Sequence, residues 1–218
     1  QAMEIASWGD NVYVKIPITN TKQETCYALV KKLAEKEVKV NVTALMTLTQ
    51  VRDVVAVLNP EIPSYVSIFA GRIADTGYDP LPMMKKSVDM LKAAPASELI
   101  WASPRELLNI FQADDIGCHI ITVTNDILKK LSLVGYDLDQ YSLDTVKMFY
   151  KENTNSLINN LREMFYKITI KNDVDSNLDL RMRKLVTTYN NRKCHGFQPF
   201  VISLKCKSLM KYINDLKT

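Results

Sequence analysis

Short apolar segments recur along the chain, and each is followed by a stretch with helical spacing. This alternation constrains the fold more than any other feature, because strands that alternate with helices specify a parallel sheet covered by helices. The segments predicted to be strands are residues 11–19, 38–44, 65–70, 99–103 and 119–124. A helix is predicted over residues 1–8, so the sequence indicates a helix followed by five β/α units of about 25–30 residues each.

Polar or charged residues close several of the predicted strands. They are Lys15, Thr43, Arg72 and Ser103. The carboxyl ends of parallel strands meet at one edge, where the active sites of β/α barrels are built. No glycine-rich phosphate loop follows any predicted strand, which argues against a Rossmann or P-loop fold. The pattern therefore favours a barrel with its site at the carboxyl ends of its strands.

Local signals predict where the helices begin. Thr21 and Glu24 fit a capping box for a helix that runs to about Lys36. Residues 71–79 are rich in Gly and Asp and are predicted to be a loop. The other helices are predicted from Thr47 to before Pro60, over 81–93, from an N-cap at Ser103 to about Ala113, and from Thr124 or Asn125 onward.

Lys15 is the candidate nucleophile. It lies beside Val14 and Ile16 and just before Pro17, which cannot donate to a ladder and so marks the carboxyl end of the strand. A lysine amine removed from water favours its neutral form, and a neutral amine can form a Schiff base with a carbonyl. The spacing leaves open the alternative of a solvated lysine at a strand terminus.

Composition and charge divide the chain into two regions. It has 218 residues, 47% of them apolar, with no apolar run long enough to span a bilayer and no signal peptide in its first residues. Residues 151–218 carry 13 basic and 6 acidic side chains, whereas residues 1–150 carry 15 and 18. We therefore predict a barrel-type region over 1–150 and a separate basic extension over 151–218. The cysteines, which lack metal-ligand spacing and are predicted to be reduced thiols of a cytoplasmic protein, are Cys26, Cys118, Cys194 and Cys206.

The strand segments together resemble the small, single-domain transaldolases, including the fructose-6-phosphate aldolases, over residues 1–150. Five stretches carry the resemblance: WGDNVYVKIPIT at 8–19, NVTA at 41–44, SIFAGRI at 67–73, WAS at 101–103 and GCHIITVT at 117–124. They are similar to the fourth to eighth barrel strands of that family. The resemblance thus implies an incomplete TIM (β/α)8 barrel that lacks the first three strands. Such an open barrel is expected to expose two strand edges.

The resemblance also implies the site, residue by residue. Lys15 matches the lysine that forms the Schiff base, and Thr43 matches the threonine beside it. Phe69 matches an aromatic position in the site. Arg72 and Ser103 match residues that contact the substrate phosphate.

The implied activity is the transfer or release of a three-carbon dihydroxyacetone unit from a ketose phosphate. It needs no metal and no organic cofactor, because the substrate is bound covalently as a Schiff base. The resemblance implies a cytoplasmic enzyme with sugar-phosphate substrates and allows a homo-oligomer, without nucleic acid or membrane as partners. The alternative is an inactive barrel remnant or scaffold fused to a foreign tail, because the acid and base groups of the family's first strands have no counterpart here.

Several of these residues keep a structural alternative. Arg72 could pair with Asp75 or Asp79 in the following loop. Thr43 could only satisfy a hydrogen bond within the barrel, and Ser103 could only cap a helix.

Residues outside the resemblance have simpler predicted roles. His119 on an apolar strand is predicted to be a core histidine, and Trp8 and Trp101 are predicted to pack. The extension over 151–218 is predicted to be mostly helical. Its helices are placed near 156–166, over 178–189 and from 208, with an apolar run over 197–204.

Overall fold

The computed structural model describes residues 1–153 and 201–205. The chain divides into two compact units. One contains residues 1–132 together with strand β6 (Val201–Lys205), and the other begins at Leu133.

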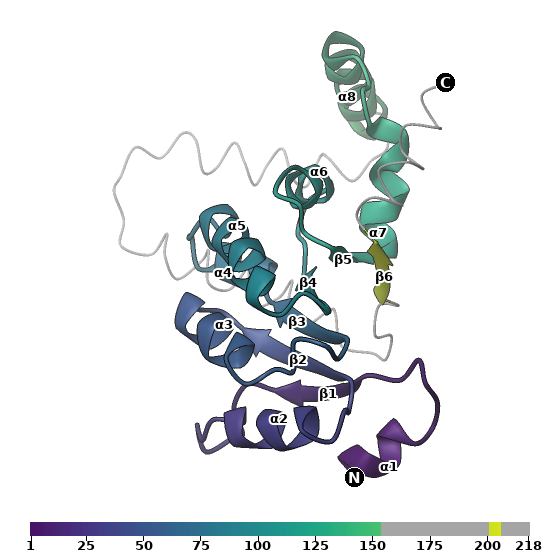
Figure 1. Cartoon of the computed structure of the whole chain (residues 1–218). Coiled ribbons are helices and arrows are strands. Elements are labelled where there is room, and N and C mark those ends of the chain that lie inside the picture. The colour runs from purple at the N-terminus through teal and green to yellow at the C-terminus, as the bar shows by residue number, and fades with distance from the viewer. Residues whose placement is uncertain (154–200, 206–218) are drawn as a thin grey trace. The chain divides into compact units, whose positions relative to one another are not determined.

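A single sheet forms the centre of the first unit (Figure 1). Its strands follow the order β1-β2-β3-β4-β5-β6, and each neighbouring pair from β1 to β5 is parallel. The parallel strands are β1 (Val14–Pro17), β2 (Val40–Leu45), β3 (Ser64–Ile68), β4 (Ser97–Trp101) and β5 (Ile120–Thr124). Five parallel strands in chain order, alternating with helices, confirm the predicted architecture of a partial α/β barrel.

The helices between the strands line one side of this sheet (Figure 1). They are α2 (Tyr27–Ala34), α3 (Leu48–Val55), α4 (Ala70–Asp75), α5 (Leu81–Met90) with the short 3-10 helix η1 (Leu91–Ala93), and α6 (Leu108–Asp115). Helix α1 (Ala2–Ala6) precedes β1, while α7 (Asn125–Leu128) and the 3-10 helix η2 (Lys129–Leu133) follow β5.

The core lies between the sheet and these helices. Val42 of β2, Leu99 of β4 and Ile121 of β5 are fully buried, as are Val51 of α3 and Ile110 of α6. Burying a side chain of this size stabilises a fold by about 1.5–3 kcal/mol. The alternation of the strands therefore commits one set of side chains to this core and leaves the alternate set on the opposite face, which is called the inner face below.

The predicted start of α3 is confirmed by its capping. The Thr47 hydroxyl accepts a hydrogen bond from the Gln50 amide at 3.2 Å, and Gln50 Oε1 accepts one from the Thr47 amide at 3.1 Å. This reciprocal pair satisfies two of the amides that a helix start leaves without partners.

The capping box predicted at Thr21 and Glu24 is wrong. Helix α2 begins at Tyr27, and the oxygen of the Asn20 side chain instead accepts hydrogen bonds from the backbone amides of Lys22 and Glu24. An Asn in this position competes for the amides that a threonine cap would need, and it holds the segment in a turn.

Two further predictions around the strand ends are corrected. Residues 71–79 are not all loop, because α4 covers Ala70–Asp75. Ser103 does not begin a helix, because α6 starts at Leu108. The side-chain oxygen of Asn109 accepts hydrogen bonds from the amides of Arg105 and Glu106, at 2.8 and 3.0 Å, and so organises the segment before α6.

Strand β6 changes one expectation about the edges of the sheet. It pairs antiparallel with β5, with Thr122 opposite Ser203. The prediction of two exposed edges is therefore wrong at β5. Among the described strands the outermost are β1 and β6, and each of these two has a partner on one side only.

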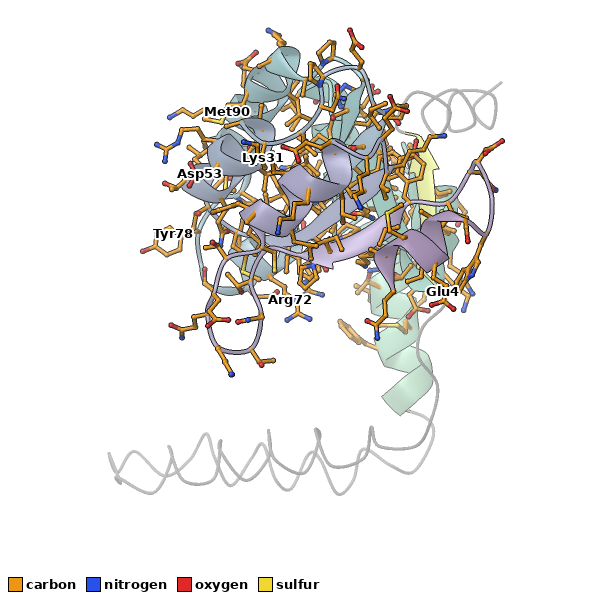
Figure 2. The ribbon with its side chains drawn as sticks, turned by 60° about the horizontal axis from the view of Figure 1, so that its bottom comes forward. Glu4, Lys31, Asp53, Arg72, Tyr78 and Met90 are labelled. Carbon is orange, nitrogen blue, oxygen red and sulfur yellow. The ribbon has the colours of Figure 1, made fainter. Side chains whose placement is uncertain are left out.

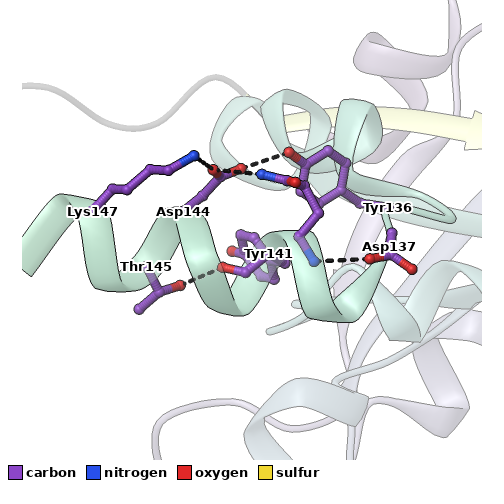
Figure 3. A network of polar contacts seen from close by, with 7 residues as sticks. Tyr136, Asp137, Tyr141, Asp144, Thr145 and Lys147 are labelled. Carbon is purple, nitrogen blue, oxygen red and sulfur yellow. Dashed lines mark hydrogen bonds and ion pairs between the residues drawn. The ribbon is translucent and has the colours of Figure 1, made fainter.

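The described part of the second unit is dominated by helix α8 (Leu138–Asn153). Its first turns carry a polar network around Asp144 (Figure 3). The Asp144 carboxylate accepts hydrogen bonds from the Tyr136 hydroxyl at 2.6 Å and from Gln140 Nε2 at 2.9 Å. The bond from Tyr136 is the main reason that the pKa of Asp144 lies below its ordinary value.

The helices predicted near 156–166, over 178–189 and from 208, and the cysteines Cys194 and Cys206, lie outside the described residues. Within the described ranges no helix is both long and apolar enough to cross a membrane.

Candidate active site

The predicted nucleophile Lys15 lies on the inner face of the sheet. Val14 and Ile16 turn toward the helices and are buried, so the alternation of β1 leaves Lys15 between them on the other side, where it is exposed. The apolar neighbours in the sequence therefore do not remove its amine from water. The structure has the solvated arrangement that the spacing left open.

Neighbouring strands bring three inner-face residues level with Lys15. It is in register with Asn41 of β2, Asn41 with Tyr65 of β3, and Tyr65 with Glu98 of β4. Residues in register on adjacent parallel strands point to the same side of the sheet. The amine thus stands in a row of polar and aromatic side chains.

Thr43 lies one step further toward the carboxyl ends of the strands, in register with Pro17. Its side chain is buried, and among the described residues its hydroxyl oxygen Oγ1 has no hydrogen-bond partner. Within the described part of the chain, no such bond supports the alternative in which Thr43 only satisfies a hydrogen bond inside the sheet. Burying a hydroxyl without a hydrogen-bond partner lowers the stability of the fold by about 1–3 kcal/mol. This cost is a reason to consider a functional role for Thr43.

The backbone is irregular directly after Thr43. The register between β2 and β3 shifts between Val42 and Leu45, and Ala44 adopts a left-handed conformation with φ +66°. Ser103, just beyond the end of β4, is also left-handed with φ +58°. Such conformations are unfavourable for residues other than glycine and are common at functional sites.

Phe69 and Arg72 lie at the carboxyl end of β3. The Phe69 ring packs against an apolar cluster made by Ile100, Ala102 and Ile120 on the inner face. The Arg72 guanidinium lies 5.4 Å from the centre of that ring and is exposed (Figure 2). An aromatic face and a cation are therefore held together at this strand end.

Arg72 does not pair with Asp75, the alternative that the sequence left open. Asp75 is bound by Arg105, whose Nε donates to Asp75 Oδ1 at 3.0 Å and whose second nitrogen donates to Oδ2. Within the described residues the Arg72 guanidinium forms no ion pair.

Ser103 lies against the start of α4, so the ends of β3 and β4 are in direct backbone contact. The Gly71 amide donates to the Ala102 carbonyl at 3.3 Å, and a Cβ atom on Gly71 would lie 1.4 Å from the Ser103 carbonyl oxygen. Glycine is required here by this close approach. The contact fixes Ser103 beside the helical turn that carries Arg72.

The Ser103 amide has a partner from the next strand. It donates to the Thr122 hydroxyl of β5 at 3.3 Å. Because α6 begins four residues after Pro104, the amides of that helix do not form an anion site around Ser103. Any anion held at Ser103 would be held by its hydroxyl and by neighbouring side chains.

Sequence reasoning missed Asn41 and the tyrosine pair Tyr13 and Tyr65. Asn41 accepts a hydrogen bond from the Ser67 hydroxyl at 2.7 Å, and the two tyrosine rings are stacked with centroids 4.0 Å apart. Burial, followed by the contact with Tyr65, raises the pKa of Tyr13. The alternation of the strands could have indicated two of these residues. Asn41 lies two positions before Thr43, and Tyr13 lies two positions before Lys15, so each pair shares a face of the sheet.

Three other predictions can be compared with the structure. His119 Nδ1 accepts a hydrogen bond from the Leu99 amide at 3.1 Å, as a core histidine would. Trp101 is buried and packs as predicted, whereas the packing predicted for Trp8 is wrong because that side chain is 71% exposed. Among the described residues no group of three or more His, Cys, Asp or Glu side chains could hold a metal ion.

One hollow in this unit lies away from the predicted residues. It has a volume of about 310 Å³ and lies between α1 and the start of β2, with Met3, Asp10 and Lys39 in its lining. It lies at the amino ends of the strands, whereas Thr43, Arg72 and Ser103 lie at the carboxyl ends. We assign the site by the chemistry of the strand ends and not by this hollow.

Comparison with known proteins identifies the family that this chain matches. The model of the family described as transaldolase/fructose-6-phosphate aldolase matches residues 1–175. A probable transaldolase of Nitrosopumilus maritimus is 30% identical over 134 residues, which are 60% of this chain and 56% of that relative.

Two further relatives have the same description. A probable transaldolase of Clostridium kluyveri is 33% identical over 133 residues, and one of Methanococcus maripaludis is 31% identical over 133 residues. Each match covers 60% of this chain and 58% of the relative. The chain therefore spans less than two thirds of the length of these relatives.

Proposed function

The chain belongs to the transaldolase/fructose-6-phosphate aldolase family, and from this we propose that Lys15 forms a Schiff base with the carbonyl of a ketose phosphate. The observation that carries the proposal is the pairing of an accessible amine with a buried, unpartnered hydroxyl on the same face of the sheet. These are Lys15 and Thr43, on neighbouring strands. An amine that can reach a carbonyl and a hydroxyl that can hold the departing water are what imine formation needs.

The chemical steps follow from the properties of an imine. The neutral Lys15 amine adds to the ketose carbonyl, and the resulting carbinolamine loses water to give a protonated imine. The hydroxyl on C4 of the ketose loses its proton, and the bond between C3 and C4 breaks as its electron pair moves toward the imine at C2. This step releases an aldehyde and leaves a three-carbon enamine on Lys15. Protonation and hydrolysis of the enamine release dihydroxyacetone, whereas its attack on a second aldehyde transfers the three-carbon unit.

The other residues have binding roles in this proposal. Arg72 supplies a guanidinium for the substrate phosphate and Ser103 supplies a hydroxyl. The first turn of α4, which carries Arg72, is held against Ser103 at Gly71. Phe69 forms the apolar wall on which the Arg72 guanidinium lies. Thr43 orients the water that leaves and later returns. We propose that no metal or organic cofactor takes part and that the reaction belongs to cytoplasmic sugar-phosphate metabolism.

Proton transfer sets the expected rate. General acid and base groups commonly contribute about 10²–10⁴-fold, and no carboxylate of the described residues is assigned to this role. We therefore expect slow turnover by this chain and choose the covalent adduct, not turnover, as the decisive measurement.

The experiment is reduction with borohydride in the presence of fructose 6-phosphate. We expect a stable mass increase on the peptide that contains Lys15, because borohydride reduces the imine to a secondary amine. Lys15→Arg should abolish the adduct, since a guanidinium does not form an imine under these conditions. Lys31→Arg, on the exposed surface of α2 (Figure 2), should leave it unchanged.

A folded chain that gains no mass on this peptide would refute the proposal. That result would favour the second candidate, a scaffold without catalytic activity. The exposure of Lys15 is the observation on that side, because a solvated ammonium is a weak nucleophile.

A further inference from the structure

Strand β5 extends further toward the carboxyl edge of the sheet than its ladder with β4 does. The register between β4 and β5 ends where Trp101 lies opposite Ile121. Residues 122–124 of β5 are paired with β6 on the other side, as far as Thr124 opposite Val201 (Figure 1). Within the described strands, the ladder to β6 therefore holds the end of β5 at which the candidate site lies.

A threonine side chain connects β5 to the β4 side beyond the end of their ladder. The Thr122 hydroxyl accepts a hydrogen bond from the Ser103 amide at 3.3 Å and donates one to the Trp101 carbonyl at 3.5 Å. Both bonds are partly buried, so water competes with them less than it would at the surface. By its length the bond from Ser103 is the stronger of the two.

The backbone of Ser103 has a conformation that needs support from its surroundings. Its φ of +58° is left-handed, which is unfavourable for a residue with a side chain and persists where neighbouring structure imposes it. The backbone conformation also sets the direction in which the side chain leaves the chain and the rotamers open to it. A hydrogen bond that holds the Ser103 amide therefore also determines where the Ser103 hydroxyl stands.

We propose that Thr122 is a positioning residue, which holds Ser103 so that its hydroxyl meets the anionic group of a substrate, and that β6 keeps Thr122 in place. The inference rests on the proposed role of Ser103 in binding the substrate phosphate. Residues 201–205 belong to the region predicted to be a separate extension, yet β6 is a strand of the same sheet. The extension thus contributes to the scaffold of the site.

The first test removes the hydroxyl of Thr122. Affinity for inorganic phosphate and for fructose 6-phosphate is measured calorimetrically on the full chain and on the variants Thr122→Val and Thr122→Ser. We expect Thr122→Val to weaken both affinities about three- to tenfold, which is the effect of about one lost hydrogen bond. Thr122→Ser keeps the hydroxyl and should keep both affinities within about twofold of the parent chain.

Dihydroxyacetone, which carries no phosphate, distinguishes positioning from a general loss of structure. Its borohydride-trapped adduct with Lys15 should form as fast in Thr122→Val as in the parent chain, because β2, β3 and β4 lie between β1 and β5. Thr145→Val is the control for loss of a threonine hydroxyl, since it removes a bond to the Tyr141 carbonyl on α8 and should leave phosphate affinity unchanged.

Three results would overturn the role of Thr122. They are equal losses of phosphate affinity and of adduct in Thr122→Val, a Thr122→Ser variant as weak as Thr122→Val, and a parent chain without measurable affinity for either phosphate ligand. Absence of a Lys15 adduct with every ketose would instead refute the proposed function, while the phosphate titrations would still decide the role of Thr122.

The second test addresses β6 with a matched pair of proline variants, Ile202→Pro and Ser203→Pro. Successive residues of a strand direct their amides to opposite sides, so one of these two amides faces β5 and the other faces away. Proline has no amide hydrogen, so one variant should break the ladder and the other should leave it largely intact. Hydrogen exchange of residues 122–124, followed by mass spectrometry, identifies which variant is which.

Phosphate affinity should follow this exchange. We expect it to fall about three- to tenfold in the variant whose β5 amides exchange faster, and to stay unchanged in the other. Faster exchange without weaker phosphate binding would overturn the role of β6. The same conclusion would follow if neither proline variant exchanged faster than the parent chain, because β6 would then not hold β5.

Discussion

Thr43 and Ser97 pose the same problem at the scale of single residues. Each has a buried hydroxyl that, within the described residues, lacks a hydrogen-bond partner. Thr43 is near the carboxyl end of β2 on the inner face, whereas Ser97 is the first residue of β4, at the opposite end of the sheet. If only Thr43 has a chemical role, removing the two hydroxyls should have the same effect on stability and different effects on function.

We predict that Thr43→Val keeps or raises the free energy of unfolding, by up to about 1 kcal/mol, because valine has the same shape without an unsatisfied hydroxyl. The same substitution should slow formation of the borohydride-trapped adduct by about tenfold or more, because water is no longer held beside the imine. Denaturant unfolding and the time course of adduct formation measure the two effects.

Ser97→Ala is the matched control for this prediction. Like Thr43→Val, it should keep or raise the free energy of unfolding, because it also removes a buried hydroxyl without a partner. Unlike Thr43→Val, it should leave adduct formation unchanged. Equal loss of adduct in both variants would mean that Thr43 acts only through the fold. A clear loss of stability in Thr43→Val would mean that its hydroxyl has a partner after all.

The single residues of the site were predictable from the sequence to different degrees. Lys15, Thr43 and Arg72 were predicted from their places at strand ends within specific motifs, and they are the residues of the proposed site. The ion pair between Arg105 and Asp75 was not predicted, because the two residues lie thirty positions apart and Asp75 stands on a helix that the sequence did not indicate. A long-range ion pair leaves no local pattern to read.

At the scale of elements, α4 shows where composition misleads. Gly71, Asp75 and Gly77 are typical of turns, so residues 71–79 were predicted to be a loop. In the structure Gly71 has a different purpose, because its missing side chain lets the first turn of α4 meet the Ser103 carbonyl. Tertiary contact overrides local propensity there, and the sequence alone could not reveal the contact.

We predict that Gly71→Ala lowers the free energy of unfolding by about 3 kcal/mol or more, because its Cβ would lie 1.4 Å from the Ser103 carbonyl oxygen. The β3 and β4 ends should move apart, so phosphate affinity should fall as well. Thermal or denaturant unfolding together with phosphate titration measures both effects.

Gly77→Ala provides the comparison, since Gly77 has φ +85° and no atom within 4 Å of its Cβ position. It should cost only about 1 kcal/mol, from backbone strain alone. If the two variants were equally stable, the close packing of Gly71 against Ser103 would be incorrect.

At the scale of the whole molecule, the parallel order of β1 to β5 was predicted correctly, because alternating strand and helix patterns allow few topologies. The pairing of β6 with β5 was not predicted. The segment 197–204 reads only as an apolar run, and nothing local to it indicates which of several edges it joins. Pairing between segments about eighty residues apart is decided by geometry that periodicity does not contain.

We predict that a chain ending at residue 198 exchanges the backbone amides of Ile120–Thr124 with solvent faster than the full chain, because their ladder to β6 is lost. The amides of β2 and β3, which have partners on both sides, should exchange as before. Hydrogen exchange followed by mass spectrometry resolves these segments. Unchanged exchange in β5 would show that β6 does not pair there.

The outer edge of β1, which has no partner among the described strands, determines how readily another chain could pair with this sheet. Val14 and Ile18 donate their amides toward β2, so the alternate residues Lys15 and Pro17 direct their backbone groups outward. Proline has no amide hydrogen, which leaves Lys15 as the one outward donor within the strand, and its charged side chain stands beside it. A foreign strand would find a single amide donor on this edge, although the outward carbonyls could still accept hydrogen bonds. The residue types of β1 therefore disfavour pairing with another chain at its outer edge.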